Sequence, residues 1–396
     1  MKNSITKLII VLLTVFLLFS TAACANSSKG GGSTGQSATG FSEHSNKAQF
    51  IYINPEGTKS DINEYYNNLG IDCDVDIRST GGDVAWKSGE FINLPKPSKK
   101  YTIGFSDYYT VDEVGAMYLD GMVEAAKEVG VELLVNDAAY DQNAQNQAIE
   151  QWILQKVDGV IMTPCDFTAV KDALDSLEKA GIPVITIDAP PQQGNIDSAV
   201  IYDCIEQGRL AGEALEKALL DSGRDMEGVI LYGTLPFVHP NAVTREIGFF
   251  EVFDKYPNIE IKALTGESPE DHYTAFEGAL LGFPDLLGAW GLYSSATYGM
   301  MNVLKAAGRS DVLLTSIDND RVILAGIYNG EVLGSACYSA IDGSRLGLMQ
   351  MINLLEGVNI PGIVYQENIF ITKDNVEKMF EEYYPGQTLQ EFIKQN

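Results

Sequence analysis

Histidine is scarce in this sequence of 396 residues, and common catalytic motifs are missing. The three histidines are His44, His239 and His272, and no two of them have the spacing of metal ligands. No Gly-Lys-Ser/Thr phosphate loop and no His-Glu-x-x-His sequence occurs. The run 31–35 matches the nucleophile-elbow pattern, but it lies in a polar stretch rather than at a strand-to-helix turn. We therefore expect no enzyme activity, no metal and no cofactor.

Basic residues are also few. The chain has 27 Lys and Arg against 54 Asp and Glu, which gives a formal net charge of −27. So acidic a chain argues against nucleic acid as a partner, because phosphates are bound through Lys and Arg. It also repels anionic ligands at long range unless local cations offset the charge.

Cysteine is limited to five residues, and no Cys-x-x-Cys pair occurs. Cys24 belongs to the N-terminal segment discussed next. Of the other four, Cys165 and Cys204 follow the carboxyl ends of expected strands, so a disulfide between them is one interpretation. Small buried thiols are an equally good interpretation for these two and for Cys73 and Cys337, since a chain of this size forms a core without disulfides.

The N-terminus has the layout of an export signal. Two lysines precede an apolar run, Leu8–Phe19, which is followed by Thr21-Ala-Ala-Cys24. The run is shorter than the ~20 residues that a spanning helix needs. We therefore expect a signal peptide over 1–23 and a lipid-modified Cys24 that anchors the protein to the extracytoplasmic face of the cell membrane. An unmodified Cys24 after cleavage is the alternative.

The next residues, 24–47, are mostly Ser, Gly, Thr and Asn, too polar to form a core, and we expect a flexible tether there. An N-terminal extension follows over 48–100, with short strands at Phe50–Ile53 and Val75–Ile77 and a helical turn or two at Asn63–Leu69. Asp72, Asp74 and Asp76 alternate along it. We expect a solvated acidic face there, because the calcium-loop pattern is not met.

From Tyr101 onward, apolar runs and amphipathic runs alternate, which indicates an α/β fold with parallel sheets. The first five expected strands are 102–106, 131–135, 159–163, 183–188 and 199–203. The next five are 228–232, 260–263, 287–290, 312–315 and 332–335. Helical periodicity separates them, and Ile341–Gly357 is a clear amphipathic helix. The pattern predicts two doubly wound halves.

Two segments carry a resemblance to a known family. Val157–Pro164, VDGVIMTP, and Ala180–Asp188, AGIPVITID, resemble the ribose-binding-protein family, the type I periplasmic or lipid-anchored sugar-binding components of ABC importers. The resemblance runs from about 101 to about 372. The same motifs fit the ligand-sensing core of lac-repressor-type regulators, which share the fold. The export signal, and the lack of a basic helix-turn-helix segment before the core, favour the exported binding protein.

The resemblance implies two lobes joined by a three-strand hinge. Matching segments place the crossings near Asp203, Tyr338 and Asn368. Lobe 1 would then comprise 101–203 plus 339–368, and lobe 2 would comprise 204–338 plus 369–396. A ligand in the cleft stabilises the closed form, because both lobes touch it only there.

Three ligand contacts are implied by position. Asp188 matches the Asp that takes sugar hydroxyls after the fourth strand, Arg245 matches a helix-start Arg, and Asp318 matches the Asp of the second lobe. Strand-end positions favour ligand contact in such sheets. The alternatives are helix or turn caps for the two Asp residues and a solvated Arg245.

The chain departs from the family pattern by being richer in tyrosine. An aromatic run after the first strand is replaced by Tyr108 and Tyr109, and the Arg that follows the fourth-strand Asp is Ala189 here. An Asn aligns with Tyr293 and a Gln aligns with Tyr338. These tyrosines, together with the strand-end residue Ser106, complete the set of candidate ligand contacts. A half-buried core aromatic is the alternative role for each Tyr.

The resulting hypothesis is a monomeric solute-binding lipoprotein that closes on a small neutral, sugar-like ligand and delivers it to an ABC transporter permease. A sensory module that presents the bound ligand to a membrane kinase or chemoreceptor is the alternative. A third interpretation, an exported enzyme on this scaffold, is disfavoured because the sequence offers no nucleophile-base pair.

Overall fold

The computed structural model describes residues 67, 70–110, 113–236 and 239–395. The expected signal peptide, Cys24, the tether and the strand at Phe50–Ile53 lie outside the described residues, as does nearly all of the helical turn at Asn63–Leu69. Within the described ranges, no helix is both long enough and apolar enough to span a bilayer.

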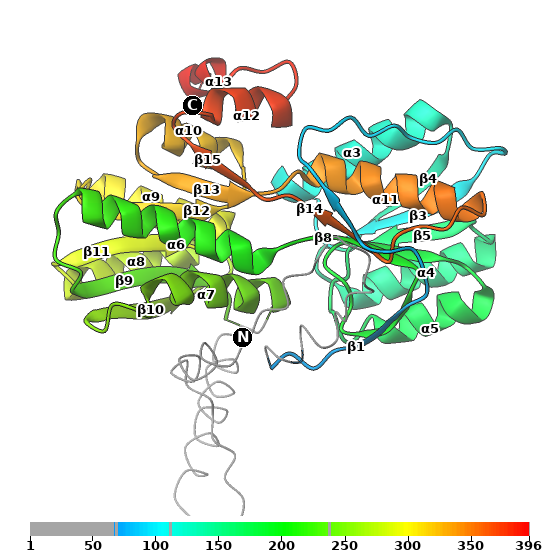
Figure 1. The fold of residues 1–396 in the computed structure, drawn as a ribbon, viewed down its shortest axis with the longest axis horizontal. Coiled ribbons are helices and arrows are strands. Elements are labelled where there is room, and N and C mark those ends of the chain that lie inside the picture. Colours follow the sequence, from blue (N-terminus) through cyan, green and yellow to red (C-terminus); the bar gives the residue numbers. More distant parts are fainter. Residues whose placement is uncertain (1–66, 68–69, 111–112, 237–238, 396) are drawn as a thin grey trace, which may run out of the picture. The chain divides into compact units, whose positions relative to one another are not determined.

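The first half is built on a seven-stranded sheet with the order β2-β14-β8-β6-β5-β3-β4, in which all neighbours are parallel. Its strands are β2 (Val84–Trp86), β3 (Thr102–Asp107), β4 (Glu132–Asp137), β5 (Gly159–Met162), β6 (Val184–Asp188), β8 (Ser198–Tyr202) and β14 (Ile363–Gln366). Helices α3 (Glu113–Val129) and α11 (Ala340–Leu355) pack together on one face. Helices α4 (Gln142–Gln155) and α5 (Lys171–Ala180) cover the other face (Figure 1).

The second half is built on a six-stranded sheet with the order β10-β9-β11-β12-β13-β15, in which only β15 runs antiparallel to its neighbour. Its strands are β9 (Gly228–Thr234), β10 (Ile259–Thr265), β11 (Leu286–Gly291), β12 (Leu313–Ile317), β13 (Gly334–Cys337) and β15 (Ile369–Thr372). Its helices are α6 (Cys204–Asp221), α7 (Pro240–Phe253), α8 (Pro269–Gly282), α9 (Ser294–Ala307), α10 (Arg321–Asn329), α12 (Val376–Tyr383) and α13 (Leu389–Gln395). Helix α6 packs on α7, and α8 packs on α9.

The fold class expected from the sequence is confirmed. Each of the ten expected strands occurs within two residues of its expected bounds, because short β-branched runs between polar turns are typical of buried parallel strands. The chain passes between the halves where β8 meets α6, where β13 meets α11, and where β14 meets β15.

The N-terminal extension packs on the first half, a placement that the sequence left open. Strand β1 (Asp74–Ile77) pairs with β7 (Gln193–Ile196), and β2 adds an edge strand beside β14. The backbone N–H of Glu367, at the crossing from β14 to β15, donates to the carbonyl of Trp86 at 2.8 Å. The acidic side chains of β1 are exposed and its apolar ones are buried, as the alternation predicted.

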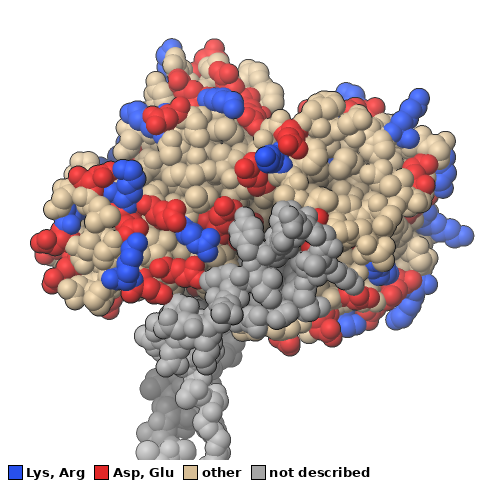
Figure 2. All heavy atoms as spheres, in the orientation of Figure 1, with Lys and Arg blue, Asp and Glu red and all other residues tan. Residues whose placement is uncertain are grey.

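Within the described residues, no disulfide joins any two of the four cysteines, so the disulfide interpretation of Cys165 and Cys204 is wrong. Cys73, Cys204 and Cys337 are buried, as the other interpretation has it, whereas Cys165 is only partly buried. Burial raises the pKa of the Cys165 thiol and that of the Cys204 thiol to about 12. Figure 2 shows acidic and basic side chains interspersed over the visible face rather than gathered into one basic patch.

Candidate ligand-binding site

Two aspartates occupy equivalent places in the two halves. Asp188 is the last residue of β6, and Asp318 directly follows β12. Both have a left-handed backbone, with φ of 74° and 75°, which is rare for residues other than Gly, Asn and Asp. Such backbone strain is concentrated at functional sites, where it is of the order of 1 kcal/mol or more per residue. The two strand ends therefore present carboxylates at a backbone cost.

Asp188 is surrounded by tyrosine hydroxyls. Its Oδ1 accepts hydrogen bonds from Tyr202 at 2.6 Å, from Tyr338 at 3.1 Å and from Tyr118 at 3.3 Å. Its Oδ2 accepts a long hydrogen bond, 3.4 Å, from the Nδ2 of Asn241, which comes from the second half. Burial raises the pKa of Asp188, and the hydrogen bond from Tyr202 opposes that shift.

The three tyrosines reach Asp188 from three different elements. Tyr118 lies within α3, Tyr202 ends β8, and Tyr338 lies in the crossing between β13 and α11. The rings of Tyr202 and Tyr338 are stacked, with centroids 3.6 Å apart. Of the three, the sequence analysis named only Tyr338. Tyr202 ends a strand next to that of Asp188, which is a signal that could have identified it.

Arg245 is the cationic side of the site. It lies on α7 and is 7% exposed. Its Nε donates to the Oε1 of Gln207 at 2.9 Å, and its Nη1 donates to the carbonyl of Leu292 at 3.3 Å. Burial alone would lower the pKa of Arg245, but Tyr202, Cys204 and Asp318 outweigh it and raise the pKa. Arg245 therefore stays charged.

The position of Arg245 depends on a close crossing of α6 and α7. A Cβ at Gly208 of α6 would lie 1.9 Å from the carbonyl oxygen of Arg245, and a Cβ at Gly248 of α7 would lie 1.9 Å from that of Ile205. No other residue type fits at such distances. The two glycines thus let α7 bring Arg245 to the strand ends.

Asp318 has the capping role that the sequence analysis gave as its alternative, and it also lies beside Arg245. Its Oδ2 accepts a hydrogen bond at 2.9 Å from the backbone N–H of Ser294, the first residue of α9, so it acts as a helix cap. Its Oδ1 lies 3.8 Å from the Nη2 of Arg245. Burial raises the pKa of Asp318, and Arg245 opposes that shift.

Ser106 and Tyr293 have their hydroxyls occupied elsewhere. Ser106 Oγ is buried and accepts from Asn136 and Gln145, both in the first half. Tyr293 Oη donates to the carbonyl of Gly266 and is 2.7 Å from the Nε2 of His272. Each is therefore positioned by its own half, and neither hydroxyl bonds to Asp188 in the described part of the chain. Their roles as ligand contacts stay predictions.

Tyr108 and Tyr109 form an aromatic cluster with Tyr140 at the carboxyl ends of β3 and β4. The ring centroid of Tyr140 is 5.4 Å from that of Tyr108 and 4.8 Å from that of Tyr109. Tyr108 contributes to the raised pKa of Tyr338, whose largest cause is burial. In this cluster Tyr108 and Tyr109 are half-buried and Tyr140 is exposed, whereas the tyrosines around Asp188 are buried.

Residues 103–359 match the family described as periplasmic binding protein domain. The chain belongs to this family. Its relatives include the ribose import binding protein of Bacillus subtilis (strain 168), which is 26% identical over 234 residues, 58% of this chain and 73% of the relative. The D-apiose import binding protein of Actinobacillus succinogenes is 27% identical over 235 residues, 58% of this chain and 74% of the relative.

Solved structures of similar fold include two solute-binding proteins of ABC transporters. One, from Actinobacillus succinogenes 130z with bound D-allose, has a TM-score of 0.65 and 21% identity and covers 70% of this chain and 100% of that chain. Another, from Mycobacterium smegmatis with bound glycerol, has a TM-score of 0.65 and 25% identity and covers 71% of this chain and 96% of that chain. The family resemblance and the type I binding-protein fold are thereby confirmed.

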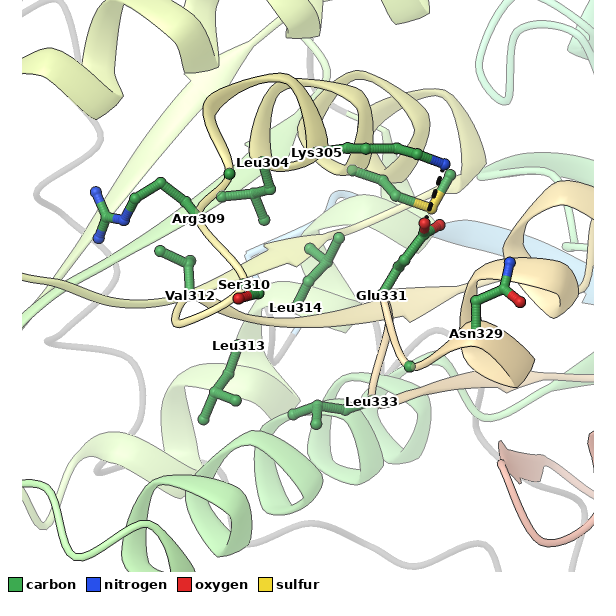
Figure 3. Close-up of a pocket in the computed structure, with 13 residues that line it drawn as sticks. Leu304, Lys305, Arg309, Ser310, Val312, Leu313, Leu314, Asn329, Glu331 and Leu333 are labelled. Carbon is green, nitrogen blue, oxygen red and sulfur yellow. Dashed lines mark ion pairs between the residues drawn. The ribbon is translucent and has the colours of Figure 1, made fainter.

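A pocket of about 340 Å³ lies elsewhere on this periplasmic binding protein domain (Figure 3). It is lined by the ends of α9 and α10 and the starts of β12 and β13, with Lys305 and Glu331 paired at 3.0 Å. Ligands of doubly wound sheets bind at the carboxyl ends of strands, whereas this pocket lies at the amino ends. The aspartate and arginine site remains the candidate.

Proposed function

We propose that this protein binds a small, hydroxyl-rich solute between its two sheets and delivers it to the permease of an ABC importer. The observation that carries the proposal is the convergence of Asp188 from one half with Asn241, Arg245 and Asp318 from the other. Family membership supports it, as do relatives that are import binding proteins for ribose and D-apiose.

The chemistry of the site suits hydroxyl groups. A hydroxyl both donates and accepts, so it can bridge a carboxylate and a guanidinium. Each charge-assisted hydrogen bond is worth about 1.5–3 kcal/mol net, and micromolar binding needs about 8 kcal/mol. A few such contacts, with one aromatic face, are sufficient. A solute that touches both halves stabilises the closed arrangement, since an open one loses half of the contacts.

The proposal includes export and a lipid anchor. The supporting feature is the sequence Thr21-Ala-Ala-Cys24 after a short apolar run. Metabolic labelling with a radioactive fatty acid tests it: we expect label on the natural chain and none after Cys24→Ser. Equal labelling of the two chains would remove the anchor from the proposal.

A thermal-shift screen of the mature protein tests ligand binding. The panel contains pentoses, hexoses, inositols, linear polyols and amino-deoxy sugars, with amino acids and dicarboxylates as controls. We expect at least one polyhydroxylated compound to raise the Tm in proportion to the logarithm of its concentration, because it binds only the folded protein. A response to the control compounds alone would overturn the proposal. So would no response to any member of the panel.

A further inference from the structure

We infer that the solute carries a positive charge as well as hydroxyl groups: an amino-substituted polyol whose ammonium group is held at Oδ2 of Asp188. This inference rests on the proposed function and names its ligand class. It is argued from the balance of charges and of hydrogen-bond donors around Asp188.

The site has more buried carboxylates than cations. Arg245 is the one buried Lys or Arg in the described part of the chain, whereas Asp188 and Asp318 are both buried. Arg245 already donates to Gln207 and faces Asp318. The residue that follows Asp188 is Ala189, which is 1% exposed and brings no charge. With both aspartates ionised, the site has a net charge of about −1, which a cationic ligand neutralises.

The hydrogen bonds around Asp188 leave mainly acceptor oxygens to face a ligand. Tyr118, Tyr202 and Tyr338 each donate their single hydroxyl proton to Oδ1, so toward a ligand they present only lone pairs, one of which, on Tyr202, already accepts from the Nδ2 of Asn241 at 3.3 Å. Within the described residues, Oδ2 accepts one hydrogen bond, a long one of 3.4 Å from the same Nδ2. A ligand group at Oδ2 therefore meets acceptor oxygens with a single amide donor beside them, and an ammonium group, with three donors and no acceptor, suits those oxygens best.

The same tyrosines also keep water away from Asp188. Tyr202 and Tyr338 are stacked, donate their hydroxyl groups to Asp188 and are each 5% exposed. A buried charge is costly unless it is paired, which favours a ligand group of opposite charge at this carboxylate. Hydroxyl groups elsewhere on the same ligand would meet Arg245 and Asp318.

Matched pairs of ligands test the inference. Titration calorimetry at pH 7 compares D-glucosamine with D-glucose, D-galactosamine with D-galactose, and an amino-deoxy inositol with myo-inositol. For the pair whose sugar or inositol ring fits the site, we expect the amino member to bind at least tenfold more tightly than the neutral member. A neutral member that binds as tightly or more tightly overturns the inference and leaves the proposed function standing. No binding by any polyhydroxylated compound, charged or neutral, overturns both.

The variant Asp188→Asn tests the residue assignment. It keeps the size of the side chain and removes its charge, so the preference for the amino member should fall to about threefold or less. Glu246→Gln is the matched control: this buried carboxyl group bonds to Thr234 instead and should leave the preference unchanged. An unchanged preference in Asp188→Asn overturns the assignment. If that variant does not fold, the ligand pairs on the natural protein still decide the inference.

Discussion

The carboxylate of Glu113 accepts a hydrogen bond from the backbone N–H of Arg321 at 2.7 Å and pairs with its guanidinium at 2.9 Å. Glu113 begins α3 in the first half, and Arg321 begins α10 in the second. The hydroxyl of Tyr384 donates to the same carboxylate. Glu113 therefore caps a helix that belongs to the other half, so this contact requires the two halves to lie together.

Replacing Glu113 with Gln should weaken ligand binding. Gln keeps one acceptor oxygen but loses the charge, and the partial exposure of both side chains limits the loss to about 1 kcal/mol. Because the contact favours the closed arrangement, we expect the Kd of the bound solute to rise about fivefold, mainly through faster dissociation. Stopped-flow fluorescence measures that rate.

Arg345→Gln provides the control for this prediction. Arg345 pairs with Glu128 at 2.8 Å, but this pair joins α11 to α3 within the first half. Its loss should leave the Kd unchanged. Equal effects of the two variants would mean that the Glu113 contact does not report on closure.

Gly208→Ala should displace α7 and with it Arg245. The added methyl group meets a backbone carbonyl that cannot rotate away, and such overpacking costs about 3 kcal/mol of unfolding free energy. Gly278→Ala is the comparison, since a Cβ there meets nothing within 4 Å in helix α8, and it should stabilise by about 0.5–1 kcal/mol. Urea unfolding measures the free energy of unfolding of both variants. An unchanged value for Gly208→Ala would contradict the described crossing of α6 and α7.

Glu246→Gln should change how stability depends on pH. Burial raises the pKa of Glu246 from 4.5 to about 7. A carboxyl group with a raised pKa contributes stability that is fully present below the unfolded value, 4.5, and is lost as the pH rises through about 7. The free energy of unfolding of the variant, relative to that of the natural protein, should thus rise by up to about 3 kcal/mol as the pH rises from 4.5 to 8.

Unfolding curves across that pH range test this prediction. Glu213→Gln, which removes an exposed carboxyl group on α6, serves as the control for the loss of a surface carboxyl group. If the free energy of unfolding of Glu246→Gln differs from that of the natural protein by the same amount at every pH, Glu246 titrates alike in the folded and unfolded chains.

Tyr202→Phe should destabilise the protein by about 2 kcal/mol, because it removes the shortest hydrogen bond to the buried charge of Asp188. Tyr328→Phe is the control, since no hydrogen bond of the Tyr328 hydroxyl occurs within the described residues, and it should cost less than about 0.5 kcal/mol. Chemical unfolding compares them. Similar losses in the two variants would argue that Asp188 does not depend on its tyrosines.

The fold was predictable from the sequence because parallel strands buried on both faces leave a strong local pattern. The runs that became β6 and β12 also located Asp188 and Asp318, since strand ends are visible in the sequence. Strand β2 was missed. Its three residues are too few to show an alternation of apolar and polar side chains, and the strand forms by pairing with the open edge of β14.

The tyrosines around Asp188 were harder to predict. Tyr118 lies in the buried face of α3 with Val114 and Met122, where an aromatic residue is typical of the core. Only the tertiary arrangement directs its hydroxyl toward a carboxylate 70 residues further along the chain. The sequence also could not show that the hydroxyl of Tyr293 bonds to His272, because that bond depends on how α8 packs on α9, which Tyr293 directly precedes.

A crystal structure of the mature protein with its tightest ligand is the most direct test of the account. We predict one ligand that contacts Asp188 from the first half and Arg245 or Asp318 from the second, with any amino group at Oδ2 of Asp188. A ligand found in the pocket beside Lys305 and Glu331, or in contact with one half alone, would contradict the account.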